Sequence, residues 1–256
     1  MRIVVKVGTS TLAHQTGRIN IRHVENLVKV LSDIKNEGHE IILVSSGAIG
    51  MGVGKLSLPR RPEDIATKQA AAAVGQCELM YTYDKLFSEY GHTVAQILLT
   101  GEDMESDVRR HNFENTLSRL IELHTVPVVN ENDTVATAEI AFGDNDTLSA
   151  RVACSVKADL LILLTDIDGL YTANPHEDKD AKLIPFVEEI TPAVEALGGS
   201  SGSRLGTGGM ITKLRAGKMA NAQGIDMIIA NGNDPAILYE IMEGKSVGTL
   251  FKGKKL

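Results

Sequence analysis

The sequence predicts an α/β fold in which helices cover both faces of one mainly parallel β-sheet. Runs of branched aliphatic residues alternate with longer helical segments along almost the whole chain, which is the pattern of strand–helix–strand units. Hydrophobic residues make up 43% of the 256 residues and aromatic residues only 4%. A core built from Val, Ile, Leu and Ala suits strands that are buried on both faces.

The predicted strands and helices follow one another in order. Aliphatic runs of strand length occupy residues 2–7, 40–45, 92–98, 125–129, 158–164 and 225–230. Segments with helical spacing occupy residues 21–34, 62–90, 106–123, 146–156, 210–223 and 235–242. Gly38 supplies a stop for the first of these helices.

Three segments depart from this rhythm. Residues 45–52 predict a glycine-rich turn, residues 134–142 alternate like a hairpin, and residues 198–209 form a flexible Gly/Ser-rich segment. No internal repeat and no long linker is visible, so residues 1–256 are predicted to form a single domain.

Composition excludes several classes of protein. The formal net charge is −7 and no basic block is present, so we expect no nucleic-acid partner. Cys77 and Cys154 lie far apart, which argues against a disulfide framework or a zinc site. The N-terminus lacks the pattern of a signal peptide, and no apolar run reaches the ~20 residues of a membrane span. We therefore expect a cytoplasmic protein that does not bind membranes.

Ligands of such sheets bind beyond the carboxyl ends of the strands, and the first strand ends with Lys6 and Gly8. A lysine in a buried strand is costly unless it is paired. Taken alone, Lys6 favours a side chain that reaches the surface. The functional alternative is an ammonium group directed at a phosphate, with Gly8 allowing the ligand to approach the backbone.

The second strand is followed by two serines and three glycines over residues 45–52. Backbone N–H groups in such a loop, with a helix N-terminus behind them, can form an anion-binding nest over residues 45–52. The alternative is a mobile surface loop. The glycine spacings of Walker and dinucleotide-binding loops are both absent.

Asn and Asp residues gather on both sides of the hairpin-like segment, at residues 130–133 and 142–146. Either group alone is an ordinary turn. Two groups flanking one hairpin predict a polar site, whose acceptors could bind an ammonium group and whose carboxylate could orient lysine side chains.

Residues 207–213 open a helix with two glycines, and Lys213 lies one turn inside it. The exposed N–H groups and the lysine could bind one anion, although a capped surface helix fits nearly as well. Thr165 and Asp166 follow the fifth strand as a simple turn or as an edge that holds a nucleotide.

Two lysines, two anion nests and an acidic cluster match the needs of phosphoryl transfer, which depends mostly on positioning and positive charge. Neither a Ser–His–Asp set nor a metal-ligand cluster is visible in the sequence. If the acceptor is a carboxylate, it is already ionised at neutral pH and needs no general base.

Seven segments in this order resemble the amino acid kinase family, and within it the members that phosphorylate free glutamate. The segments are VKVGTS (5–10), VSSGAI (44–49), NEND (130–133), FGDND (142–146), LTD (164–166), GLYTANP (169–175) and GTGGM (206–210). The resemblance implies an open three-layer αβα sandwich and an ATP-dependent reaction that makes glutamyl 5-phosphate, the committing step toward proline.

The resemblance also implies a role for each matched residue. It gives Lys6 and Lys213 the stabilisation of the transferring phosphoryl group and Asp146 the orientation of both lysines. The residues it assigns to glutamate are Ser46, Gly47, Asp133, Asp144 and Asn145. Those it assigns to ATP are Lys6, Gly8, Thr165, Asp166, Thr207, Gly208, Gly209, Met210, Ile211, Thr212 and Lys213.

Magnesium would accompany the phosphates of ATP, held by their oxygens and water, without a protein ligand. The family further implies a homo-oligomer, either a dimer or a tetramer. Many members that use glutamate continue into a C-terminal domain similar to RNA-binding PUA modules, for which this chain has no room.

Two alternatives remain at this point. The chain could be a family kinase for acetylglutamate, carbamate or a nucleoside monophosphate, although residues 130–133 and 142–146 favour free glutamate. It could also be a non-catalytic amino-acid sensor, although the presence of both Lys6 and Lys213 argues against that.

Overall fold

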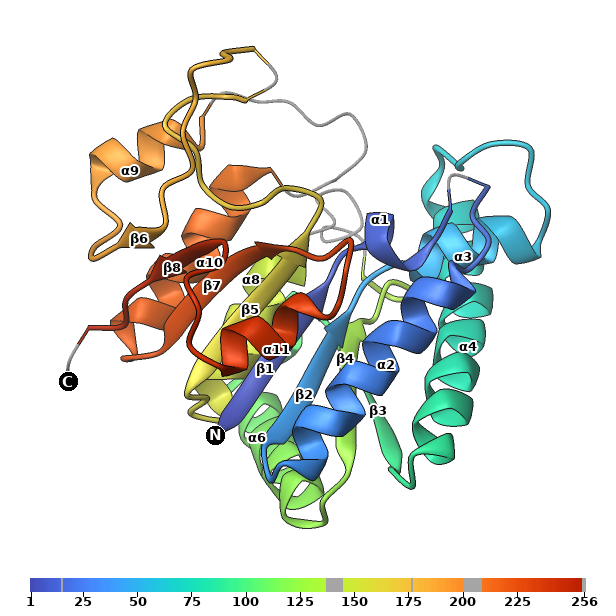
Figure 1. Ribbon diagram of the computed structural model, residues 1–256. Coiled ribbons are helices and arrows are strands. Elements are labelled where there is room, and N and C mark those ends of the chain that lie inside the picture. The colour runs from blue at the N-terminus through green and yellow to red at the C-terminus, as the bar shows by residue number, and fades with distance from the viewer. Residues whose placement is uncertain (15, 137–144, 176, 200–208, 255–256) are drawn as a thin grey trace.

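The computed structural model describes residues 1–14, 16–136, 145–175, 177–199 and 209–254, and Figure 1 shows their arrangement. In the described part, eight strands form one sheet in the order β3-β4-β2-β1-β5-β7-β8-β6. The strands are β1 (Arg2–Val7), β2 (Glu40–Ser45), β3 (Val94–Leu99), β4 (Val126–Glu131), β5 (Leu160–Thr165), β6 (Phe186–Val187), β7 (Asp226–Asn231) and β8 (Thr249–Phe251).

The helices lie between these strands. They are α1 (Thr9–Leu12), α2 (Ile21–Asn36), α3 (Ala48–Lys55), α4 (Ile65–Glu89), α5 (Gly101–Glu105), α6 (Asp107–Glu122), α8 (Asn145–Ser155), α9 (Pro192–Leu197), α10 (Met210–Ala222) and α11 (Ile237–Met242). None of the helices in the described ranges is long and apolar enough to cross a membrane.

The sheet is parallel except where β7 meets β8. Strand β1 lies between β2 and β5, with Lys6 opposite Val44 on one side and Leu163 on the other. The chain therefore extends the sheet first in one direction from β1 and later in the other. Such a switch point opens a crevice at the carboxyl ends of the strands, where ligands bind in this class of fold.

Two separate apolar cores lie on opposite faces of the sheet, which makes the fold a three-layer αβα sandwich. On one face, Ile3 and Val5 pack with residues of α2, α4 and α11. On the other face, Val4 packs with residues of α6, α8 and α10. Figure 1 shows α2, α4 and α11 in front of the sheet. The predicted fold class is confirmed.

Local signals explain where several helices begin. The side chain of Asn20 accepts a hydrogen bond from the backbone N–H of His23 at the start of α2, and Asp64 accepts one from Thr67 at the start of α4. Thr100 and Asp103 form a reciprocal capping box around α5. The turn after α2 contains Gly38, whose φ of 95° lies in the left-handed region.

The predicted glycine-rich turn over 45–52 is wrong beyond Gly47, because the chain enters helix α3 at Ala48. Close packing between α3 and α4 explains the glycines. A Cβ atom on Gly52 would lie 1.8 Å from the carbonyl oxygen of Ala71, and one on Gly75 would lie 1.8 Å from that of Ala48. These glycines therefore allow two helix backbones to touch and do not provide loop flexibility.

All six predicted strands and all six predicted helices are present, with ends that shift by a few residues. The prediction missed α1, α3, α5, α9, β6 and β8, which are too short for periodicity to reveal. The predicted hairpin at 134–142 lies outside the described residues from position 137 onward, and residues 133–135 form a turn. The predicted flexible segment at 198–209 lies outside them for residues 200–208.

Candidate active site

Three charged residues from distant parts of the chain meet at the carboxyl end of β1. Lys6 is the penultimate residue of β1, Asp146 lies in the first turn of α8, and Lys213 lies in the first turn of α10. Strand alternation places Lys6 on the same face as Val4, which is the face covered by α8 and α10. The position of Lys6 within β1 therefore decides that its side chain points toward these two helices.

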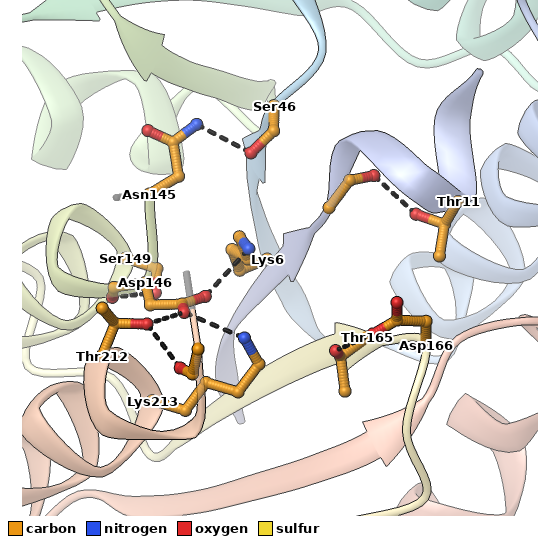
Figure 2. A network of polar contacts seen from close by, with 12 residues as sticks. Lys6, Thr11, Ser46, Asn145, Asp146, Ser149, Thr165, Asp166, Thr212 and Lys213 are labelled. Carbon is orange, nitrogen blue, oxygen red and sulfur yellow. Dashed lines mark hydrogen bonds and ion pairs between the residues drawn. The ribbon is translucent and has the colours of Figure 1, made fainter. Parts of the chain in front are cut away.

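The carboxylate of Asp146 joins the two lysines. Its Oδ1 lies 2.8 Å from Nζ of Lys6, and its Oδ2 lies 3.1 Å from Nζ of Lys213. The hydroxyl oxygen of Thr212 is also 2.8 Å from Oδ2. Figure 2 shows this carboxylate between the ends of the two lysine side chains. The two ammonium groups are thereby held on one anion, close to each other.

All three side chains are withdrawn from solvent, with exposed fractions of 11% for Lys6, 7% for Lys213 and 1% for Asp146. Burial of the carboxylate opposes its ionisation. The ammonium groups of Lys6 and Lys213 outweigh burial and lower the pKa of Asp146 to about 2. Asp146 is therefore ionised at any physiological pH.

Among the described residues, two ammonium groups and one carboxylate meet in a nearly dry site. Two preorganised ammonium groups that converge on one point are suited to stabilise negative charge on a bound anion. The required anion must reach two lysines at once, as the oxygens of a phosphoryl group can.

The residue before Asp146 makes contacts on another side of the crevice. Nδ2 of Asn145 lies 2.9 Å from each of three acceptors, namely the carbonyl oxygen of Ser45, Oγ of Ser46 and Oδ1 of Asn130. Figure 2 shows the contact with Ser46. Two consecutive residues at the start of α8 therefore anchor two different groups of side chains, one charged and one neutral.

Gly47 ends the short connection from β2 and serves as the N-cap of α3, with a φ of 99° in the left-handed region. A left-handed backbone at this position favours glycine, since it has no Cβ atom. A Cβ atom on Gly47 would contact Thr9, so the start of α3 lies close to the residues that follow β1. The free N–H groups in the first turn of α3 come directly after Gly47. Such a helix start is suited to anions.

The predicted ATP residues lie around the same strand ends. Thr165 ends β5, the neighbour of β1, and its hydroxyl donates to Oδ1 of Asp166 at 3.1 Å. Gly8 caps α1 directly after β1. Gly209, Met210, Ile211 and Thr212 form the start of α10, where the hydroxyl oxygen of Thr212 also lies 2.8 Å from the carbonyl oxygen of Gly209.

The remaining predicted residues lie in the turn after β4 or outside the described ranges. Asp133 lies in the turn after β4, two residues beyond the last strand residue, Glu131. Asp144, Thr207 and Gly208 lie outside the described residues. The described residues contain no group of three or more His, Cys, Asp or Glu side chains that could hold a metal ion.

Sequence reasoning missed two buried amides. Asn130 belongs to a segment that was recognised as polar, yet its own side chain was not singled out. Gln76 lies on α4, and its Oε1 accepts a hydrogen bond from Nδ2 of Asn130 at 2.8 Å. A signal for Gln76 does exist, because it shares one buried face of α4 with Leu79 and Tyr83 and is flanked by small residues.

Comparison with known proteins agrees with this geometry. A model of the amino acid kinase family matches residues 1–231, which include every residue described in the site above. The chain belongs to the amino acid kinase family. A glutamate 5-kinase from Clostridium perfringens is 53% identical over 258 residues, covering 99% of this chain and 96% of that protein. A glutamate 5-kinase from Listeria innocua is also 53% identical, covering 99% of this chain and 94% of that protein.

The solved structures with a similar fold are more distant in sequence. A UMP kinase from Bacillus anthracis superposes with a TM-score of 0.65 at 15% identity, covering 99% of this chain and 96% of that one. An isopentenyl phosphate kinase from T. acidophilum superposes with a TM-score of 0.64 at 18% identity, covering 98% of this chain and 100% of that one. These similarities support the fold alone.

Proposed function

We propose that this chain transfers the γ-phosphoryl group of ATP to the side-chain carboxylate of free glutamate. The product is glutamyl 5-phosphate, and the reaction is the first step of proline biosynthesis in the cytoplasm. The observation that carries the proposal is the pair of buried lysines held on the carboxylate of Asp146. Glutamate is chosen as the acceptor because relatives of nearly the same length, at 53% identity, are glutamate 5-kinases.

Lys6 and Lys213 supply the positive charge that the reaction needs. An oxygen of the glutamate side chain attacks the γ-phosphorus, and the bond from phosphorus to the β,γ-bridging oxygen breaks. The electron pair of that bond leaves with ADP. Negative charge on the phosphoryl oxygens is stabilised by ammonium groups that are already in place, which is the main source of catalysis in phosphoryl transfer.

Asp146 positions the two lysines and does not move a proton. Its pKa of about 2 keeps it ionised, and both its oxygens already contact ammonium groups. The acceptor carboxylate is itself ionised at neutral pH, so the reaction requires no general base. A site without histidine at its centre is therefore consistent with this chemistry.

The residues around the lysines divide between the two substrates. We assign glutamate to Ser46, Gly47, Asn145, Asp133 and Asp144. ATP is assigned to Gly8, Thr165, Asp166 and the start of α10, together with Thr207 and Gly208. The N-terminal part of a single domain, residues 1–256, then mainly binds glutamate and the C-terminal part mainly binds ATP.

Magnesium is the expected companion of ATP. The carboxylate of Asp146 already pairs with two lysines, so the donor set fits a metal that is held by phosphate oxygens and water. Bound in this way, Mg²⁺ neutralises part of the phosphate charge. The protein is also proposed to be a homo-oligomer, a dimer or a tetramer, which light scattering after size-exclusion chromatography tests.

The proposal is tested by an ADP-release assay with ATP and Mg²⁺, comparing glutamate, acetylglutamate, carbamate and UMP as acceptors. We expect turnover with glutamate at a kcat/KM at least tenfold above that of the other acceptors. Preference for acetylglutamate would contradict the assignment of the acceptor. Binding of glutamate by calorimetry without any ADP release would indicate a sensor instead of an enzyme. Repeating the assay with added proline shows whether the end product of the pathway inhibits the enzyme.

A further inference from the structure

We propose that Gln76 is a positioning residue for glutamate, acting through Asn130 and Asn145. The proposal rests on the function given above and deepens it. Gln76, Asn130 and Asn145 are buried, with exposed fractions of 7%, 2% and 6%. Their side-chain amides form a continuous chain of hydrogen bonds, 2.8 Å from Gln76 to Asn130 and 2.9 Å from Asn130 to Asn145. These hydrogen bonds connect Gln76 on α4 to Asn145 at the start of α8.

Two backbone groups determine which way these amides face. The carbonyl oxygen of Ser45 can only accept, so the nitrogen of Asn145 must face it, at 2.9 Å. The backbone N–H of Glu131 can only donate, so Oδ1 of Asn130 must face it, at 2.8 Å. The same Oδ1 accepts from Asn145. Both asparagine amides are therefore oriented by groups that cannot exchange their roles.

This orientation leaves Nδ2 of Asn130 facing α4, where it needs an acceptor. A buried amide nitrogen without a partner is costly, comparable to the full desolvation of the group. Oε1 of Gln76 supplies that acceptor, while its own Nε2 has no hydrogen-bond partner among the described residues. If Gln76 were absent, the cost could be relieved only by turning or shifting the Asn130 amide, which would disturb its contact with Asn145.

The orientation matters for what the site presents to an amino acid. Because its nitrogen already has acceptors, Asn145 keeps Oδ1, which has no hydrogen-bond partner among the described residues. Oγ of Ser46 accepts from Asn145, so the hydroxyl proton of Ser46 remains able to donate. An acceptor on Asn145 and a donor on Ser46 are the kinds of group that the α-ammonium and a carboxylate of glutamate require. Gln76 thereby preserves an arrangement of polar groups that it does not itself present to the ligand.

The first test compares Gln76→Leu, which removes the acceptor at similar volume, with Gln76→Glu, which keeps an acceptor oxygen. We expect Gln76→Leu to raise KM for glutamate about tenfold, the scale of one buried unpaired donor, while KM for ATP stays within about twofold. Gln76→Glu should recover most of the glutamate affinity. The matched control is Tyr83→Phe, which removes the 2.9 Å contact with Oγ of Ser45 from the same face of α4. It should lower Tm but leave KM for glutamate within about twofold.

The results distinguish a failure of the proposed function from a failure of the inference about Gln76. Wild-type protein without turnover of glutamate would overturn both the proposed function and this inference. An active wild type whose Gln76→Leu variant keeps its KM for glutamate would overturn the inference alone. Equal rises in KM for both substrates, or no recovery by Gln76→Glu, would mean that Gln76 only supports folding and would also overturn it.

A double substitution tests the direction of the amides. In Asn130→Asp, Gln76 can turn its amide and donate Nε2 to the new carboxylate. In Asn130→Asp combined with Gln76→Glu, two acceptors face each other and no such rotation helps. We expect Gln76→Glu to be mild in the wild type but to lower kcat/KM for glutamate by about tenfold in the Asn130→Asp background. Additive effects of the two substitutions would contradict the hydrogen-bonded chain.

Discussion

The site has two halves, a charged half held by ion pairs and a neutral half held by hydrogen bonds between uncharged groups. On the side of α8 and α10, two lysines and one aspartate form buried ion pairs. On the side of β2 and β4, neutral amides and a serine form hydrogen bonds of 2.8 to 2.9 Å. Asn145 and Asp146 are neighbours in sequence, yet each belongs to a different half. In the proposed reaction, the charged groups stabilise the developing negative charge and the neutral groups orient glutamate.

The largest effect is expected in the charged half. Lys213→Ala should lower kcat by about 10²-fold or more, because one preorganised charge donor is lost from the transition state. Steady-state kinetics with both substrates measures it. Lys218→Ala is the matched control, since Lys218 lies on the same helix, is 60% exposed and pairs with Glu195. It should change kcat by less than about twofold. A loss confined to KM for ATP would show that Lys213 only binds the nucleotide.

The charged half should also contribute a distinctive dependence of stability on pH. The folded state lowers the pKa of Asp146 from 3.8 to about 2. A carboxylate with a lowered pKa stabilises the fold above its unfolded pKa, and this contribution is lost as pH falls through the folded value. Between pH 4 and pH 2 the free energy of unfolding should therefore decline by about 2 kcal/mol more in the wild type than in Asp146→Asn.

Denaturant titrations of the wild type and Asp146→Asn at several pH values measure this difference. Parallel declines in the two proteins would mean that the ion pairs add no stability to the fold. Activity should show no titration of Asp146 between pH 5 and 8, because its carboxylate stays ionised there.

At the residues proposed to bind glutamate, effects should appear in substrate binding. Asp133→Ala should weaken glutamate binding about tenfold, the scale of a charge-assisted hydrogen bond to an ammonium group, with ATP affinity nearly unchanged. Isothermal calorimetry with each substrate separates the two affinities. If the affinities for glutamate and for ATP fell equally, Asp133 would not belong to the glutamate site.

The smallest effect is expected at Ser46. Ser46→Ala removes one neutral hydroxyl, so KM for glutamate should rise about threefold to tenfold while kcat changes little. Ser46→Thr keeps the hydroxyl and is the control. If Ser46→Ala lowered kcat as strongly as Lys213→Ala, the division between a charged catalytic half and a neutral binding half would be incorrect.

The contrast between the halves also explains what sequence reasoning could find. Lys6 and Lys213 stand out because lysine is rare in buried strands and at glycine-rich helix starts. Asn130 and Gln76 do not stand out, since asparagine in a turn-like segment and glutamine on a long helix are ordinary. The glycines of residues 45–52 led to a wrong prediction of a turn where helix α3 begins, because close helix packing and flexible loops both favour glycine.

The amino-acid sequence by itself determined the alternation of strands and helices, and hence the parallel sheet with helices on both faces. These features depend on the spacing of apolar residues within each segment, which can be read directly from the sequence. The resemblance implied that Asp146 orients both lysines, but only the tertiary structure showed that its two oxygens contact the two ammonium groups and that Gln76 faces Asn130. Such contacts join segments far apart in the chain, and they form where the order of the strands and the face of each side chain bring those segments together.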